Sequence, residues 1–392
     1  MRPWTWRAIV LGAVVSSLVV GSTRLTAHNP ITSRYTFNAD AYPILRARCG
    51  ACHVEGGIAP MSLMTHAEAV PWAESIRQEL LAGHMPPWQI DSPSGRIRNS
   101  SALTPHELDV LLTWATGGTP VGETSAPAPV RANPGWRLGT PDRVLQLPEV
   151  TLSESQREDV KEFKIPLGLP EERWVRAVDL TPGTSAFVRS ATITAMTTSS
   201  LGKPTEQVLA LWQPGDEPIA LESNIGFRLP PSATLVARVH YKKTWRDAQR
   251  AMSDASTIGV YFATGPRSVQ PLVLAPPDAR GSLVTEKGPL TFMHAIDRDM
   301  TALSIYPDVT LSGVSLKVVA VSPDGTRDTL VAMRARSEWA RRYWFNEPVV
   351  LPRGGRLEVT ARADDTLLAP QAPRIPVRPL DPATFRLVMD VY

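Results

Sequence analysis

Cys49-Gly50-Ala51-Cys52-His53 is the stretch on which the interpretation of this chain depends. Two thiols separated by two residues and followed directly by an imidazole are what covalent attachment of a c-type haem requires. Each thiol adds to one vinyl group of the porphyrin, and the histidine beside the second thiol lies under the iron as its proximal ligand. The chain has only these two cysteines. We therefore predict one haem, attached through Cys49 and Cys52 and ligated by His53.

Two other kinds of site use a pair of cysteines with this spacing. A zinc site would need two further thiolate or imidazole ligands at similar spacing, and no second pair is present. A thioredoxin-like dithiol would need a surrounding βαβ pattern, which the flanking sequence lacks. Haem attachment is the interpretation that the residues favour.

The sequence around the motif predicts a small helical cytochrome c domain over residues 34–121. A first helix over residues 38–48 would lead directly into Cys49. A second is expected from Thr65 to Leu80, although Pro71 removes one helical hydrogen bond. The third is expected after Thr104, because Thr104 and Glu107 have capping-box spacing and Pro105 occupies the first helical position.

The sixth ligand of the iron is expected in the same domain. Met85 is our first choice, because Pro86 and Pro87 stiffen the loop that carries it and would hold the thioether against the iron. His84 is the alternative, and a second imidazole would lower the potential relative to a thioether. Met61 and Met64 are expected to fill the core, as most methionines near a cofactor do.

The N-terminus has the pattern of an export signal. Arg2 and Arg7 precede an apolar run over residues 8–20, which is short for a bilayer span of about 20 residues. Residues 1–27 are therefore expected to be a signal peptide cleaved near Ser22 or Ala27, or otherwise an uncleaved membrane anchor. Both versions place the protein in the periplasm. The net charge of +3 gives no indication of a nucleic-acid partner.

The chain beyond residue 121 changes character. Residues 122–135 are rich in proline and small residues, which is typical of a semi-rigid linker. After it come short segments rich in Val, Ile, Thr and aromatic residues, separated by turn signals such as Ser322-Pro323-Asp324-Gly325. Strands of this kind predict two antiparallel jelly-roll sandwiches, over residues 136–265 and 266–392.

Several short motifs, taken in order, resemble a known family. The family consists of bacterial cytochrome c modules fused to domains similar to the copper type II ascorbate-dependent monooxygenases. The resemblance covers nearly the whole chain after the signal, and it implies the same two sandwiches. The motifs that carry it are Ile58–Leu63, Met85–Trp88, Trp174–Val178, Val239–Tyr241, Pro307–Gly313, Pro323–Thr326 and Asn346–Pro348.

The resemblance also implies where copper would bind, and most of those ligands are replaced. The first copper normally takes a His-His pair and a third histidine. This chain has Arg189 and Ser190 in place of the pair, and it retains the third histidine as His240. The second normally takes a His-x-His pair, where this chain has Asp308 and Thr310. Copper in such sites needs imidazole and thioether donors, and an arginine adds a positive charge where a cation should bind. Bound copper is therefore not expected.

Taken together, the sequence predicts an exported single-haem c-type cytochrome that transfers electrons. The degenerate sandwich pair would serve as a docking or structural module for a redox partner, or within a membrane electron-transfer complex. The alternative is a copper-dependent monooxygenase that receives electrons from its fused cytochrome. Export and one covalent haem are common to both.

Overall fold

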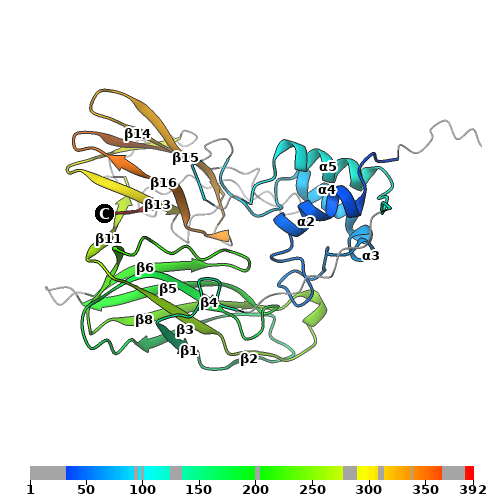
Figure 1. The fold of residues 1–392 in the computed structure, drawn as a ribbon, viewed down its shortest axis with the longest axis horizontal. Helices are drawn as coiled ribbons and strands as arrows, with labels where there is room; N and C mark the ends of the chain where they lie inside the picture. The colour runs from blue at the N-terminus through cyan, green and yellow to red at the C-terminus, as the bar shows by residue number, and fades with distance from the viewer. Residues whose placement is uncertain are drawn as a thin grey trace, which may run out of the picture.

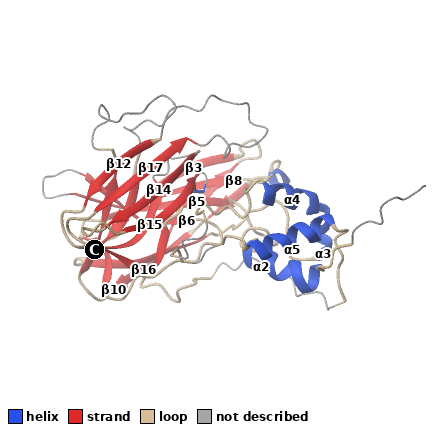
Figure 2. Ribbon diagram, turned by 90° about the horizontal axis from the view of Figure 1, so that it is seen from above, coloured by secondary structure: helices blue, strands red, loops and turns tan. Residues whose placement is uncertain are grey.

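A computed structural model describes residues 32–91, 96–98, 101–123, 135–198, 204–276, 289–307, 313–336, 339–363 and 385–392. The structure is 44% strand and 15% helix, and its strands form four sheets. Figure 1 shows two stacked β halves with the helices at one end, and Figure 2 shows the same arrangement from above. The predicted signal at residues 1–27 and most of the predicted linker lie outside the described residues.

The largest sheet has eight strands and runs through both β halves. Their spatial order is β1 (Arg143–Gln146), β10 (Thr257–Ala263), β4 (Arg173–Thr181), β7 (Ile225–Leu229), β11 (Arg267–Leu274), β18 (Leu387–Val391), β13 (Met300–Pro307) and β16 (Tyr343–Leu351). β11 pairs in parallel with β7 and antiparallel with β18. A single strand thus joins the two halves edge to edge.

Three smaller sheets cover this one. One has the order β3 (Glu158–Pro166), β8 (Thr234–Lys242), β5 (Val188–Thr198) and β6 (Pro204–Trp212), and a second has β12 (Leu290–Ala295), β17 (Arg356–Ala363), β14 (Val314–Val321) and β15 (Arg327–Ala335). A two-stranded sheet pairs β2 (Val150–Leu152) with β9 (Met252–Asp254). The inward side chains form one apolar core in each half, around Tyr241 in the first and Tyr343 in the second. The β character predicted for the chain after residue 135 is confirmed. β12 and the first half of β14 alternate between buried and less buried residues, whereas β13 is buried at nearly every position.

The helices are few and short. They are α2 (Tyr42–Arg48), α3 (His66–Ala69), α4 (Ala73–Leu81) and α5 (Pro105–Thr116), with a π-helical turn at Phe37–Ala41 and 3₁₀ turns at Val70–Trp72 and Trp245–Asp247. The single helix predicted from Thr65 to Leu80 is interrupted at Pro71, which lacks the N–H that an α-helix needs there. α5 begins as predicted, since Thr104 and Glu107 form both hydrogen bonds of a capping box.

The predicted fold class, a separate helical cytochrome c domain followed by two jelly rolls, is wrong. The structure is mostly β, and no separate helical cytochrome c domain is visible among the residues that it describes. The short helices do pack on one another around Phe37 and Trp114, but the chain between α4 and α5 joins the second β half. Ile90 bridges to Met333, Ile97 bridges to Phe345, and both isoleucines belong to that half's core. Hydrophobic periodicity could not reveal this, because the segment pairs only with residues more than two hundred positions away.

One buried arginine ties the β halves together where the large sheet crosses between them. Arg342 donates to the carbonyl oxygens of Leu209 at 2.6 Å and Val208 at 2.7 Å, both in the first half. Its Nε lies 3.0 Å from a carboxylate oxygen of Asp390 on β18. The Asp390 carboxylate also accepts a short hydrogen bond from the Ser304 hydroxyl. Both ionic side chains are almost fully buried, at 3% and 1% exposure. The ion pair holds Arg342 within the second half, and its hydrogen bonds to β6 link that half to the first.

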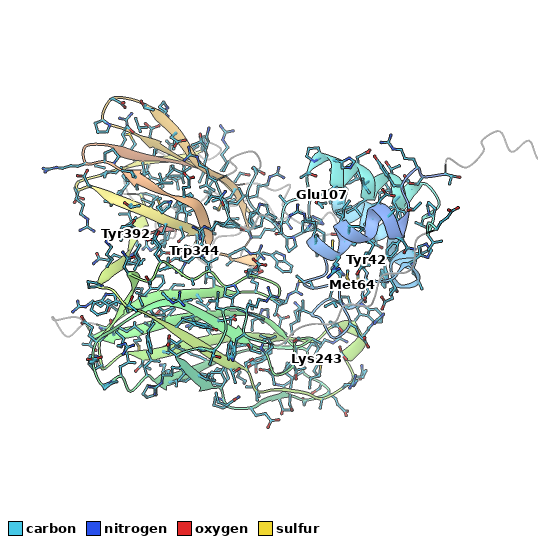
Figure 3. All side chains as sticks on the ribbon, viewed as in Figure 1. Tyr42, Met64, Glu107, Lys243, Trp344 and Tyr392 are labelled. Carbon is cyan, nitrogen blue, oxygen red and sulfur yellow. The ribbon has the colours of Figure 1, made fainter. Side chains whose placement is uncertain are left out.

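Figure 3 shows Tyr42, Met64 and Glu107 within the helical segment and Trp344 on the β side. Within the part of the chain that the structure describes, no helix has the length and apolar character needed to cross a bilayer.

Candidate functional site

The two cysteines lie where α2 ends. Cys49 is the C-terminal cap of α2, and its N–H donates to the carbonyl of Leu45 at 2.9 Å. The N–H of His53 donates to the carbonyl of Cys49 at 2.9 Å, so the five residues form a compact turn. Both thiols are free and half-buried. Burial raises the pKa of Cys49 to about 12 and that of Cys52 to about 11, which keeps both sulfurs as neutral thiols at physiological pH.

The ring of His53 is oriented by a single backbone contact. Its Nδ1 lies 3.3 Å from the carbonyl oxygen of Met61, and a carbonyl can only accept, so Nδ1 carries the proton. This tautomer leaves Nε2 as the lone-pair donor, which is the arrangement found for most metal-ligating histidines. Burial lowers the pKa of His53, which favours the neutral ring that a metal requires. Two free thiols and an oriented neutral imidazole fit a covalently attached haem.

The two candidates for the sixth ligand follow α4. Met85 borders a cavity of about 220 Å³ together with Leu103, Leu108 and Trp88. His84 is held in another way, because its Nδ1 lies 3.0 Å from a carboxylate oxygen of Glu79. The thioether of Met85 borders a cavity, and the Nδ1 contact of His84 leaves its Nε2 free, so both side chains have a donor atom available. Met85 stays our prediction for the sixth ligand, with His84 as its alternative.

The cysteine turn packs directly on the first β half. Cys52 Sγ lies 3.7 Å from the carbonyl oxygen of Pro214, in the loop between β6 and β7. Gly215 in this loop has φ +83°, and a Cβ atom there would overlap with Cβ of Ala51. Only glycine allows this close approach and this backbone conformation. The contact fixes where the two thiols lie relative to the sheets.

Gly215→Ala is expected to destabilise the protein and to disturb the cysteine turn. The substitution adds about 1 kcal/mol of left-handed strain and about 1–3 kcal/mol of overlap with Ala51. The control is Gly139→Ala, since Gly139 has φ +81° and nothing within 4 Å of its added Cβ. Urea unfolding should show a larger loss of unfolding free energy for Gly215→Ala than for Gly139→Ala. The double variant Gly215→Ala/Ala51→Gly should recover most of that difference. Equal losses for the two glycines would contradict the close contact.

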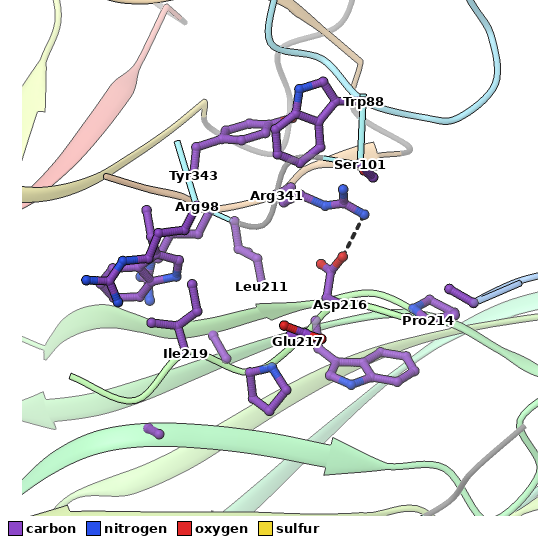
Figure 4. A pocket seen from close by; sticks show the side chains of 18 of the residues that line it. Trp88, Arg98, Ser101, Leu211, Pro214, Asp216, Glu217, Ile219, Arg341 and Tyr343 are labelled. Carbon is purple, nitrogen blue, oxygen red and sulfur yellow. Dashed lines mark ion pairs between the residues drawn. The ribbon is translucent and has the colours of Figure 1, made fainter. Parts of the chain in front are cut away.

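A pocket of about 360 Å³ opens beside Cys52, between the helical segment and both β halves. Figure 4 shows Trp88 and Tyr343 on one side and Asp216, Glu217 and Ile219 on the other. Arg341 reaches across and forms an ion pair of 2.6 Å with Asp216. Burial raises the pKa of Asp216 to about 6 in spite of this arginine.

The raised pKa of Asp216 predicts a pH dependence of stability. Its carboxyl has an ordinary pKa of 3.8, so the folded chain holds this proton more strongly than the unfolded chain does. This contribution to stability is therefore complete below pH 4 and is lost as the pH rises through 6. Relative to Asp216→Asn, the unfolding free energy of the wild type should fall by about 2 kcal/mol between pH 4 and pH 7.

The matched control for that measurement is Asp324→Asn. Asp324 is exposed, and the backbone N–H of Thr326 holds its pKa below the ordinary value. Its contribution changes only at more acidic pH, so the difference between this variant and the wild type should stay constant from pH 4 to pH 7. A constant difference for Asp216→Asn as well would contradict the raised pKa.

Of the expected copper positions, the structure describes Arg189, Ser190 and His240. Ser190 and His240 are opposite each other on β5 and β8, but Nε2 of His240 lies 2.7 Å from the carboxylate of Glu158. Arg189 stacks on the ring of Trp339 at 4.7 Å, and its charge acts to lower the pKa of the Cys52 thiol. Asp308 and Thr310 lie outside the described residues. Among the residues that the structure does describe, no group of three His, Cys, Asp or Glu side chains is arranged to hold a metal ion.

The pocket residues were not found from the sequence. Trp88, Trp212, Asp216 and Arg341 come from four separate segments, and no spacing pattern links them. The Pro214-Gly215-Asp216 turn was the one local signal, because a glycine in a turn between strands often marks close approach of another backbone.

Comparisons with known proteins assign no family. No protein-family model matches the sequence, and no curated protein is significantly similar to it. Among solved structures, a turret protein of Sulfolobus turreted icosahedral virus is 8% identical, with 64% of this chain and 97% of that chain covered and a TM-score of 0.17. A Paenibacillus xanthan lyase is 11% identical, with 69% and 27% covered and a TM-score of 0.17.

Proposed function

We propose that this protein is an exported electron-transfer protein with a single covalently attached haem. The observation that carries the proposal is the geometry of the cysteine turn, in which two free thiols flank an imidazole whose Nδ1 is engaged by the carbonyl of Met61. The haem, when bound, supplies a one-electron couple. In this proposal the haem would be held by the turn that follows α2, through Cys49, Cys52 and His53.

The protein's own residues have three tasks in this function. Cys49 and Cys52 tether the cofactor, so that it is not lost on repeated oxidation and reduction. His53 is oriented as a neutral ligand through Met61. The loop at Pro214 and Gly215 shields one side of the turn from water, and lower exposure of the cofactor reduces the reorganisation that accompanies electron transfer.

The β halves are proposed to position this centre beside a redox partner. They contribute most of the described chain, and His240, the retained residue of the expected copper ligands, pairs with Glu158. A periplasmic location follows from the export pattern of residues 1–27, and the partner would be a redox protein or a membrane electron-transfer complex.

A haem and metal inventory of the native protein tests the proposal. The protein is to be produced with export and with haem-attachment machinery, and then examined by intact mass and by its reduced absorption spectrum. We expect one covalent haem per chain, the α-band of a c-type haem and no stoichiometric copper. A chain without covalent haem would overturn the proposal, and about two coppers per chain would favour a monooxygenase.

A further inference from the structure

The pocket beside Cys52 has walls of two kinds. Aromatic rings line it from both β halves and from the helical segment, namely Trp88, Trp212, Phe227, Tyr343 and Trp344. Its charged lining is dominated by arginines at positions 48, 98, 176, 341 and 342, against the acids Asp216 and Glu217. A flat apolar surface combined with excess positive charge selects for an aromatic or conjugated anion.

The positive charge of the pocket is only partly compensated. Arg48 pairs with Glu107, Arg341 with Asp216 and Arg342 with Asp390. Arg98 and Arg176 remain, against the lining acid Glu217. Arg98 donates to the neutral carbonyl of Asn346 at 3.2 Å. For Arg176, no ion pair forms with any residue that the structure describes.

Arg341 also retains an unused donor. Its side chain is 13% exposed, and its Nε is buried with no hydrogen-bond partner among the described residues. An unsatisfied buried N–H on a charged group is costly, and a carboxylate would satisfy it. Arg341 further lies over the ring of Trp88, with its guanidinium carbon 5.7 Å from the ring centre. Cation and aromatic ring therefore face the same space.

We propose that this pocket binds the carboxylate of a flat organic anion, with Arg341 and Arg176 holding the charge and the tryptophans holding the ring. A volume of about 360 Å³ admits a molecule of one or two fused rings. The carboxylate has two chemical sources, either a free organic acid or a propionate of the covalently bound haem. The second source rests on the proposed function, whereas the first does not.

The test compares 2-naphthoate with its uncharged counterpart 2-naphthamide. Their binding is to be measured calorimetrically on the haem-loaded chain and on the full-length Cys49→Ala/Cys52→Ala chain, which cannot attach haem. The test variant is Arg176→Gln, chosen because it breaks no ion pair seen among the described residues. The control is Arg353→Gln, which removes an exposed arginine of the second β half that does not line the pocket. Circular dichroism confirms that each variant is folded.

Two results together indicate a free organic acid. Naphthoate binds the haem-loaded chain with an affinity at least tenfold higher than that of naphthamide, and Arg176→Gln lowers the affinity for naphthoate about tenfold. A haem propionate is indicated if naphthoate binds only the haem-free chain and Arg176→Gln lowers the midpoint potential of the loaded one. The inference is overturned if neither form prefers naphthoate to naphthamide and the potential is unchanged. If the native protein carries no covalent haem, only the proposed function is overturned. Naphthoate binding to the haem-free chain still tests whether the pocket holds a carboxylate.

Discussion

Replacing Cys49 and Cys52 together by alanine is expected to remove covalent haem completely. Thioether bonds form only at these two positions, because the chain has no other cysteine. The intact mass should then equal that of the polypeptide alone, and the c-type absorption should be absent after acid–acetone extraction. The fold should persist, since both thiols are only half-buried and free of disulfide bonds.

Single substitutions in the same region separate attachment from ligation. His53→Ala is expected to keep the thioethers and lose the low-spin spectrum, because the attachment atoms are unchanged while the proximal nitrogen is gone. Met85→Ala should alter the spectrum and lower the potential, and His84→Ala should leave both unchanged. The reverse result at positions 84 and 85 would make His84 the sixth ligand. Haem retained covalently by the double cysteine variant would refute attachment at this motif.

Arg342→Met is expected to produce the largest loss of stability of any substitution considered for this protein. The arginine is 3% exposed, and it connects two carbonyl oxygens of β6 with the buried carboxylate of Asp390. Removing it leaves Asp390 as an uncompensated buried charge, and such changes typically cost about 3–5 kcal/mol. The unfolding free energy from urea denaturation measures the loss.

Two further variants identify the cause of that loss. Arg342→Met/Asp390→Asn removes both charges and should recover part of the stability, because the remaining cost is that of the unpaired β6 carbonyls. Arg327→Met breaks an exposed pair with Glu358 and should have a much smaller effect, since solvent screens that interaction. If Arg342→Met were no more harmful than Arg327→Met, Arg342 would not tie the halves together.

The strands and the clearest helix were predictable because their signals are local. β14 alternates between buried and less buried positions, and this two-residue period can be seen in Val314, Leu316 and Val318. α5 starts where a threonine, a proline and a glutamate stand at the capping positions. Such patterns involve residues only a few positions apart, so they can be recognised in the sequence without the tertiary structure.

The fold class was wrong because it depended on distant pairing. The segment containing Ile90 and Ile97 has no strong strand pattern, and its partners Met333 and Phe345 lie far along the chain. The eight-stranded sheet likewise crosses between halves through β11, whose two neighbours are separated by more than 150 positions in sequence. Pairing of this kind is determined by which edges meet in space, and no local pattern encodes it.

By itself, the sequence predicted haem attachment at Cys49-Gly50-Ala51-Cys52-His53, because covalent attachment needs only those atoms at that spacing. It also determined most of the strands and the start of α5. Only the tertiary structure decided that this turn packs on Gly215, that Arg341 and Asp216 meet beside Cys52, and that His240 pairs with Glu158. The physical reason is that bonding chemistry is local, whereas the surroundings of a site are assembled from chain segments that packing alone brings together.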